Sequence, residues 1–234
     1  MLQSLSQAIQ LIAALDPALA EIVALSLRVT STALLFSTIL GIPLGVFLGL
    51  KRFLARRLVI AFLYTGMGFP PVVVGLFVYM LLSRSGPLGR TGWAFIPALF
   101  TPAAMVLAQI IIALPMVAGF TMAAVMGVDP GLRQQVQSLG ATPWQTGVTI
   151  LLEARMGVMT AVIAGFGSII SEVGAVMMVG GNIERSTRVL TTAIVLETNK
   201  GNFTLAMALG LILLGLTFVA NVAMLRLQGK ALDR

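Results

Sequence analysis

The sequence contains no cysteine and no histidine. Without cysteine, the chain can form neither a disulfide nor a thiolate metal site. Without histidine, it lacks the side chain that most often serves as a general base or a metal ligand. Charged residues are also scarce, at 10 % of the chain, whereas a soluble domain contains about 25 %. This scarcity excludes an ordinary soluble domain.

Apolar residues, in contrast, make up 58 % of the chain and gather in long stretches. A hydrocarbon core about 30 Å thick is crossed by roughly 20 helical residues. We therefore predict an all-α membrane protein with about five transmembrane helices. The predicted spans are residues 22–50, 58–82, 94–126, 157–181 and 203–225.

The formal charge is +7, from 15 Lys and Arg against 8 Asp and Glu. In a soluble protein this excess would suggest nucleic acid, but here we assign it to topology and to contact with anionic lipid. An N-terminus outside and a C-terminus in the cytoplasm place nine basic residues inside and five outside, as the positive-inside rule favours. The inner nine are Lys51, Arg52, Arg56, Arg57, Arg133, Arg155, Arg226, Lys230 and Arg234, and the outer five are Arg84, Arg90, Arg185, Arg188 and Lys200.

The N-terminal segment does not have the pattern of a signal peptide, since no Lys or Arg precedes Arg28. Apolar residues recur there at helical spacing among glutamines and serines. This pattern predicts a short helix over residues 1–15 that lies in the membrane interface.

Proline and glycine interrupt two of the predicted spans, at residues 66–71 and at Pro97, Pro102 and Pro115. Such bends either serve packing or line a pathway. In the first span, Gly41, Gly45 and Gly49 form overlapping GxxxG repeats, which allow another helix to approach closely. The partner is either a helix of the same chain or a second copy.

Residues 127–156 form a long connection that the charge pattern places in the cytoplasm. Asp129 is a candidate N-cap for a helix that begins at Pro130 and ends before Gly140, where we expect a positive φ. Thr142 and Pro143 repeat the start signal for a second helix. Apolar residues follow one face of each helix: Leu132, Val136 and Leu139 in the first, and Trp144, Val148 and Leu151 in the second.

This connection resembles the EAA loop of ABC importer permeases. The resemblance rests on Ser138-Leu139-Gly140-Ala141-Thr142-Pro143-Trp144, followed by Ile150 and Leu152. Two positions depart from the family pattern. Gln134-Gln135-Val136 replaces the Glu-Ala-Ala triplet, and Glu153 replaces a proline.

The segment after this loop indicates which branch of the permease family the sequence resembles. Residues 171–183, SEVGAVMMVGGNI, are similar to the corresponding segment of permeases for sulfate, molybdate and tungstate. Residues 191–201, TTAIVLETNKG, look closest to the tungstate branch. Further upstream, the run GFPPVVVG at residues 68–75 also fits this family.

The resemblance implies a single permease domain over residues 1–234 with the type I importer fold, in the inner membrane. It implies a homodimer, two cytoplasmic ABC ATPases and an extracytoplasmic oxyanion-binding protein. The expected ATPase contacts are Leu139, Gly140, Ala141, Thr142, Pro143, Trp144 and Gln145. The chain lacks a G-x-x-x-x-G-K-[ST] phosphate loop, so we predict a non-catalytic subunit without a cofactor, whose partner ATPase holds ATP and Mg.

Few residues are candidates for contact with the transported solute. Glu172 is the only acid well inside a predicted span. It has either a structural or gating role or a direct role in transport. Ser168, Ser171 and Asn182 are the other pathway or gate candidates. Arg185 and Arg188 lie in a predicted outer loop, where they either steer an oxyanion or pair with Glu184 and Glu197.

Two other classes of membrane protein are alternatives to an importer. An intramembrane hydrolase would need paired aspartates, a nucleophile with a basic partner, or metal ligands, none of which the predicted spans contain. A proton-coupled secondary transporter would use Glu172 as its proton carrier. Among importers, tungstate, molybdate and sulfate have the same charge and shape, so molybdate and sulfate remain alternatives to tungstate.

Overall fold

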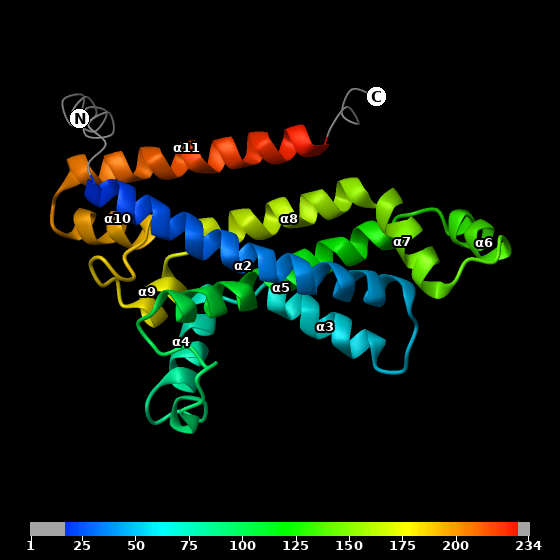
Figure 1. The fold of residues 1–234 in the computed structure, drawn as a ribbon, viewed down its shortest axis with the longest axis horizontal. Helices are drawn as coiled ribbons and strands as arrows, with labels where there is room; N and C mark the ends of the chain where they lie inside the picture. The colour runs from blue at the N-terminus through cyan, green and yellow to red at the C-terminus, as the bar shows by residue number, and fades with distance from the viewer. Residues whose placement is uncertain (1–16, 229–234) are drawn as a thin grey trace. The chain divides into compact units, whose positions relative to one another are not determined.

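Helices form all the regular secondary structure that the computed structural model describes, over residues 17–228 (Figure 1). In chain order they are α2 (Pro17–Leu50), α3 (Arg56–Met67), α4 (Pro71–Leu82), the 3-10 turn η1 (Gly89–Thr91), α5 (Pro102–Met126), α6 (Pro130–Ser138), α7 (Pro143–Glu153), α8 (Arg155–Ile170), α9 (Gly174–Gly180), α10 (Leu190–Asn199) and α11 (Phe203–Gln228). The predicted interfacial helix over residues 1–15 lies outside the described residues.

Three described helices, α2, α5 and α11, are long and apolar enough to cross a bilayer. Two bent helix pairs, α3 with α4 and α7 with α8, raise the number to five if each pair is one span. The prediction of an all-α protein with about five spans is therefore confirmed. The bounds of three of the predicted spans need correction.

The span predicted over 58–82 is two helices, separated at Gly68–Pro70. Pro70 has ψ 122°, which is extended backbone, and Pro71 begins α4. A proline at the first helical position is favoured because its fixed φ suits the helix and its missing N–H has no partner there in any case. The predicted interruption at residues 66–71 is thus a helix boundary.

The span predicted over 94–126 begins later, at Pro102, and residues 94–101 are not helical. Phe100 has φ +60°, which no α-helix accommodates. Thr101 then caps the helix, because its hydroxyl oxygen accepts a hydrogen bond from the Ala104 N–H at 3.3 Å. Apolar composition predicted helix where this local geometry prevents it.

The span predicted over 157–181 was wrong at its C-terminal end. Helix α8 ends at Ile170, and α9 begins only at Gly174. The apolar length comes instead from α7, which precedes α8 at a bend of 72°. The sequence pattern predicted α7 only as an amphipathic helix of the cytoplasmic connection. In the structure, Ile150 on α7 is buried.

The described residues group into two compact units, each built from separate stretches of chain. The first contains residues 17–33, 70–109 and 169–223. In it, α4 packs on α9 so closely that a β-carbon on Gly75 would lie 2.6 Å from the Ala175 Cα (Figure 1). The prediction of a single domain over residues 1–234 stays a prediction.

The second unit contains residues 34–69, 110–168 and 224–228. Its core includes the contact between the GxxxG repeats and α5. A β-carbon on Gly45 would lie 2.5 Å from the Ala118 carbonyl oxygen, and one on Gly49 would lie 2.8 Å from Val125 Cγ1. Of the two partners considered for these glycines, the helix of the same chain is the one that the structure contains.

Candidate functional site

Hydrogen bonds define both ends of α6 and the start of α7. Asp129 caps α6, since its Oδ1 accepts a hydrogen bond from the Gly131 N–H at 2.8 Å. At the other end, the Gly140 N–H donates to the Gln137 carbonyl at 3.0 Å and the Ala141 N–H donates to the Val136 carbonyl at 3.3 Å. This pair of bonds is a Schellman motif, which satisfies the last carbonyls of a helix.

Gly140 is the residue that allows this ending. Its φ is +84°, so the predicted positive φ is confirmed. A β-carbon there would meet no atom within 4 Å, which means that the demand for glycine is conformational rather than spatial. The chain therefore turns sharply between the two helices without internal crowding.

Helix α7 begins with a capping box. The Thr142 hydroxyl oxygen accepts from the Gln145 N–H at 3.3 Å, and Gln145 Oε1 accepts from the Thr142 N–H at 2.8 Å. Pro143 occupies the first helical position. Two backbone N–H groups are satisfied within four residues, so the start of α7 is fixed by local sequence. We call residues 139–145 the corner.

The corner presents large apolar side chains to its surroundings. Leu139 is 87 % exposed and Trp144 is 80 % exposed. Behind them, Thr146 and Ile150 are buried, and Ile150 packs with Val125 in the core of the second unit. An exposed aromatic on a rigid, anchored turn has the character of an interface hot spot.

The predicted apolar face of α7 coincides with its core face only at Leu151, which packs on the core that contains Ile150. Trp144 and Val148 are exposed, whereas Thr146 and Ile150 point into the core. The sequence pattern grouped residues by hydrophobicity alone, and threonine did not enter it. The face that contains Trp144 is consequently available to a partner.

Glu172 lies in the first unit, in the break between α8 and α9. Its side chain is buried, and Oε1 accepts a hydrogen bond from the Ala175 N–H at 2.9 Å. Its backbone carbonyl accepts from the Thr191 hydroxyl at 2.8 Å. The carboxylate thus satisfies an N–H at the start of α9, where a helix terminus favours negative charge.

A small cavity of about 10 Å³ adjoins Glu172 within the first unit, and its lining includes Ser26 and Gln109. Gln109 Nε2 donates to the Ile169 carbonyl at 3.1 Å. The Ser26 hydroxyl accepts from the Leu190 N–H at 2.8 Å. These polar groups satisfy backbone atoms that the helix breaks leave free.

The other pathway candidates are placed as follows. Ser168 is half-buried on the last turn of α8, in the second unit. In the first unit, Ser171 is exposed at the helix break. Asn182 has φ +51°, and its Nδ2 lies 3.5 Å from the Thr192 carbonyl oxygen.

Arg185 and Arg188 lie on the loop between α9 and α10. The Ile183 carbonyl accepts backbone N–H groups from three residues, including Thr187 and Arg188, which closes this loop tightly. Arg185 is exposed, with φ +56°. Arg188 is mostly covered and lies 3.5 Å from a Glu184 carboxylate oxygen. Only Arg185 therefore presents its charge freely at the surface of this loop.

Glu197 organises the turn between α10 and α11. Its Oε1 accepts from Lys200 Nζ at 2.8 Å, and its Oε2 accepts from Asn202 Nδ2 at 3.0 Å. The hydrogen bond from Lys200 lowers the pKa of Glu197 most, against an opposing effect of burial, with help from Asn202 and the charge of Arg188. Glu197 is therefore a charged structural centre.

Comparison with known proteins identifies the family. Residues 41–232 match the family described as "binding-protein-dependent transport system inner membrane component". This chain belongs to that family. The permease is accordingly a non-catalytic component of an inner membrane transport system.

Several curated relatives cover most of the permease. It is 42 % identical to the probable anion ABC transporter permease protein of Haloferax volcanii, over 92 % of this chain and 93 % of the relative. It is 39 % identical to the tungstate uptake system permease protein TupB of Peptoclostridium acidaminophilum, over 94 % and 95 %. It is 31 % identical to the molybdenum transport system permease protein ModB of Escherichia coli, over 74 % and 77 %.

Solved structures show the same fold at low sequence identity. A structure titled as inward facing conformations of the MetNI methionine ABC transporter superposes with a TM-score of 0.75, at 21 % identity over 90 % of this chain and 94 % of that one. A bacterial ABC transporter for the acidic polysaccharide alginate gives a TM-score of 0.71, at 20 % identity over 94 % and 83 %. The permease therefore has the type I importer fold that its sequence predicted.

Sequence reasoning missed several structural residues of the permease. Ser26, Gln109 and Thr191 bond to backbone groups that lie 164, 60 and 19 positions away in the chain, respectively, and no local pattern reveals such partners. Glu172 was found because an acid in an apolar run is rare. No group of three or more potential metal ligands gathers among residues 17–228. The predicted absence of a cofactor stays a prediction.

Proposed function

We propose that this permease forms the transmembrane pathway of an ATP-driven importer for tungstate. The observation that carries this proposal is the extent of its similarity to permeases named for an anion and for tungstate, at 42 % and 39 % identity over more than nine tenths of the chain. Its similarity to a permease named for molybdenum is lower, at 31 % over about three quarters. Molybdate and sulfate are the alternative substrates.

In this proposal the permease works as a homodimer with two cytoplasmic ATPases. An extracytoplasmic protein delivers the oxyanion, and the ATPases hold ATP and Mg. The N-terminus lies outside and the C-terminus in the cytoplasm, as the basic residues favour. The corner, Leu139 to Gln145, docks in a groove of each ATPase.

The geometry of the corner suits this role. Its two helix ends are fixed by the Schellman motif and the capping box, so the corner moves as one piece. Thr146 and Ile150 anchor the following turns in the core of the second unit. A displacement of the docked corner is then passed to the helices that pack on Ile150, rather than lost in a flexible loop.

The solute-facing roles follow from charge. An ionised Glu172 that faced the pathway would repel a dianion, and its hydrogen bond to the Ala175 N–H supports a structural or gating role instead. We assign weak, transient contacts with the anion to the hydroxyl and amide groups of Ser168, Ser171 and Asn182. We assign steering at the outer mouth to Arg185 and Arg188.

The decisive experiment reconstitutes the permease in proteoliposomes with its ATPase and binding protein. Uptake of labelled tungstate is then measured against competing molybdate and sulfate. We expect ATP-dependent uptake that excess molybdate or sulfate inhibits less than excess tungstate does. Stronger inhibition by molybdate or by sulfate would assign the importer to that anion.

The same preparation tests the proton-coupled alternative. We expect no uptake when a proton gradient is imposed without nucleotide, because Glu172 serves the helix break and not proton transfer. Robust uptake under that condition would overturn the importer proposal. A protonophore added while ATP is held constant should leave uptake unchanged.

A further inference from the structure

An apolar groove lies beside the corner, within the second unit. It encloses about 260 Å³ between the C-terminal end of α2 and the first turns of α7. Val46 and Leu50 line it from α2, and Trp144, Gly147 and Val148 line it from α7. Lys51, at its end, is the one charged residue in the lining. The groove therefore has an apolar body and a cationic end.

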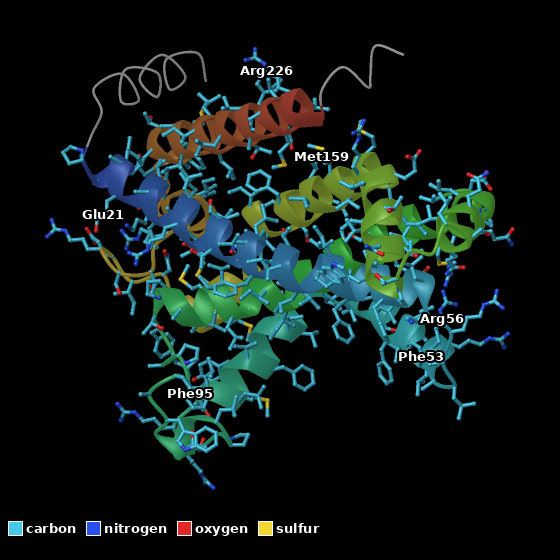
Figure 2. The ribbon with its side chains drawn as sticks, turned by 45° about the vertical axis from the view of Figure 1, so that its right-hand side comes forward. Glu21, Phe53, Arg56, Phe95, Met159 and Arg226 are labelled. Atoms are coloured by element: carbon cyan, nitrogen blue, oxygen red, sulfur yellow. The ribbon has the colours of Figure 1, made fainter. Side chains whose placement is uncertain are left out.

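Lys51 opens a basic segment that has no acidic counterpart nearby in the chain. Lys51, Arg52, Arg56 and Arg57 all lie within residues 51–57, and the sequence has no Asp or Glu between Glu21 and Asp129. Figure 2 labels Arg56, the first residue of α3, whose Nε donates to the Leu48 carbonyl at 2.9 Å. Lys51 is exposed, and within residues 17–228 the two ion pairs lie elsewhere, at Arg188 and Lys200.

The groove matches the layout of a lipid molecule, with a cationic end for a head group and an apolar body for a hydrocarbon chain. It extends along α2 from Lys51 back to Ile42, a distance of about 14 Å at 1.5 Å per residue. The basic segment marks the level of the membrane head groups, and Ile42 lies deeper in the apolar span.

We propose that this groove binds an acyl chain of an anionic phospholipid whose head group pairs with Lys51. An anionic head group complements the basic segment, and a hydrocarbon chain complements a lining that is otherwise apolar. The bound lipid bridges α2 and α7 directly behind the corner. Assignment to the cytoplasmic leaflet rests on the proposed orientation, whereas the site itself does not.

The two tryptophans of the chain allow a direct test. In a Trp93→Phe background, Trp144 is the only fluorescent indole. The full-length permease is reconstituted in phosphatidylcholine vesicles that contain increasing fractions of brominated phosphatidylglycerol or of brominated phosphatidylcholine. We expect phosphatidylglycerol to quench Trp144 with an apparent affinity about fivefold higher, as roughly 1 kcal/mol per basic residue implies. Equal quenching by the two lipids would overturn the proposal.

Lys51→Gln tests the cation of the site. The preference for phosphatidylglycerol should fall to about one, while quenching by phosphatidylcholine stays the same. Arg155→Gln is the matched control, because it removes a basic residue from the same predicted side but outside the groove lining. A preference that survives Lys51→Gln, or that Arg155→Gln abolishes equally, would reduce the effect to general surface charge and overturn the proposal.

Gly147 tests the groove itself. A β-carbon on Gly147 would meet only Leu50 Cδ1, at 3.9 Å, so a larger side chain can enter the groove without a backbone clash. Gly147→Leu should reduce quenching by both brominated lipids, whereas Gly147→Ala should largely preserve it. Unchanged quenching in Gly147→Leu would exclude the groove as the site. None of these measurements uses an ATPase or a substrate, so their failure is distinct from failure of the importer proposal.

Discussion

Two buried glutamates in the first unit show how single residues stabilise polar turns in an apolar chain. Glu172 satisfies the Ala175 N–H at the start of α9, and Glu197 accepts hydrogen bonds from Lys200 and Asn202. Each carboxylate compensates for its own burial by accepting hydrogen bonds, and Glu172 in addition satisfies a buried N–H that would otherwise have no partner. Their effects on stability can be separated experimentally.

Glu197 should make the stability of the permease depend on pH. Its pKa is lowered in the folded protein from an ordinary value of 4.5, so its stabilisation is complete above that pH and is lost as the pH falls through the lowered pKa. Glu197→Gln should lower the free energy of unfolding by about 1–2 kcal/mol at pH 7, because a hydrogen bond between charged groups is lost. The difference from wild type should vanish in strong acid.

Thermal unfolding in detergent, measured from pH 7 downward, provides the test. Glu184→Gln is the control, because Glu184 is 72 % exposed and its pair with Arg188 contributes little. A constant difference between wild type and Glu197→Gln at every pH would contradict the assignment.

Glu172 should behave as a helix cap. Glu172→Gln keeps an oxygen acceptor for the Ala175 N–H and should retain both stability and ATP-driven uptake. Glu172→Ala leaves that N–H buried without a partner and should cost about 1–2 kcal/mol of stability. Thermal unfolding and uptake are measured on both variants. Loss of uptake in a stable Glu172→Gln protein would instead indicate that the charge acts in transport.

At the level of elements, sequence predicted the helices well where local signals define them and poorly where tertiary contacts do. In the 127–156 loop, the first helix begins and ends where Asp129 and Gly140 indicated, and the second begins where Thr142 indicated, because caps act within four residues. The end of α8 at Ile170 was missed, because the groups that satisfy the break, such as Gln109 and Thr191, are distant in sequence. Hydrophobicity alone does not distinguish a continuous span from a broken one.

The corner should determine binding to the ATPase. Gly140→Val strains a backbone with φ +84°, and Trp144→Ala removes the large side chain that the corner exposes. Truncation of such an anchor costs about 2 kcal/mol, or roughly a 30-fold weaker complex. Both variants should therefore insert and dimerise yet fail to co-purify with the ATPase.

Gly140→Asn is the matched control, because asparagine tolerates a positive φ, and it should retain binding. Stability in detergent is measured on the same preparations. If Trp144 served only as an anchor in the lipid interface, Trp144→Ala would be less stable but would still bind the ATPase. Normal ATPase binding by both Gly140→Val and Trp144→Ala would defeat the docking assignment.

The contact between α2 and α5 should be intolerant of side chains. Gly45→Val places a β-carbon 2.5 Å from the Ala118 carbonyl oxygen, a backbone atom that cannot move alone. We expect a loss of about 1–3 kcal/mol or misassembly, measured by thermal unfolding and by yield of monodisperse protein. Gly210→Val on α11 is the control, since a β-carbon there meets nothing within 4 Å. Equal behaviour of the two variants would show that this packing is not critical.

At the level of the whole molecule, the excess of positive charge bears on how an anion reaches the permease. Arg185 is exposed on the loop between α9 and α10, whereas Arg188 pairs with Glu184 and adds a small part to the lowering of the Glu197 pKa, which the hydrogen bond from Lys200 dominates. Sequence grouped the two arginines as equals. The structure separates an arginine free to act at long range from one held in the local structure.

Steering by these arginines should appear as a salt-dependent rate. Arg185→Gln with Arg188→Gln should reduce uptake mainly at low anion concentration, and the loss should shrink as ionic strength rises, because salt screens exposed charges. Arg185→Gln alone should give most of the effect without loss of stability. Uptake by the double variant that matches wild type at every salt concentration would leave the arginines a structural role only.

The way in which the corner is built has a consequence for how transport systems diverge. Every hydrogen bond that shapes it joins residues at most five positions apart, between Asp129 and Gln145. The backbone conformation of the corner is thus determined by one short segment of sequence. The ends of the membrane spans depend instead on partners that are distant in the chain. Exchanging residues 129–145 between two permeases should therefore transfer the choice of ATPase and leave the choice of transported anion unchanged. A duplicated importer would then couple to a different ATPase through changes in this segment alone.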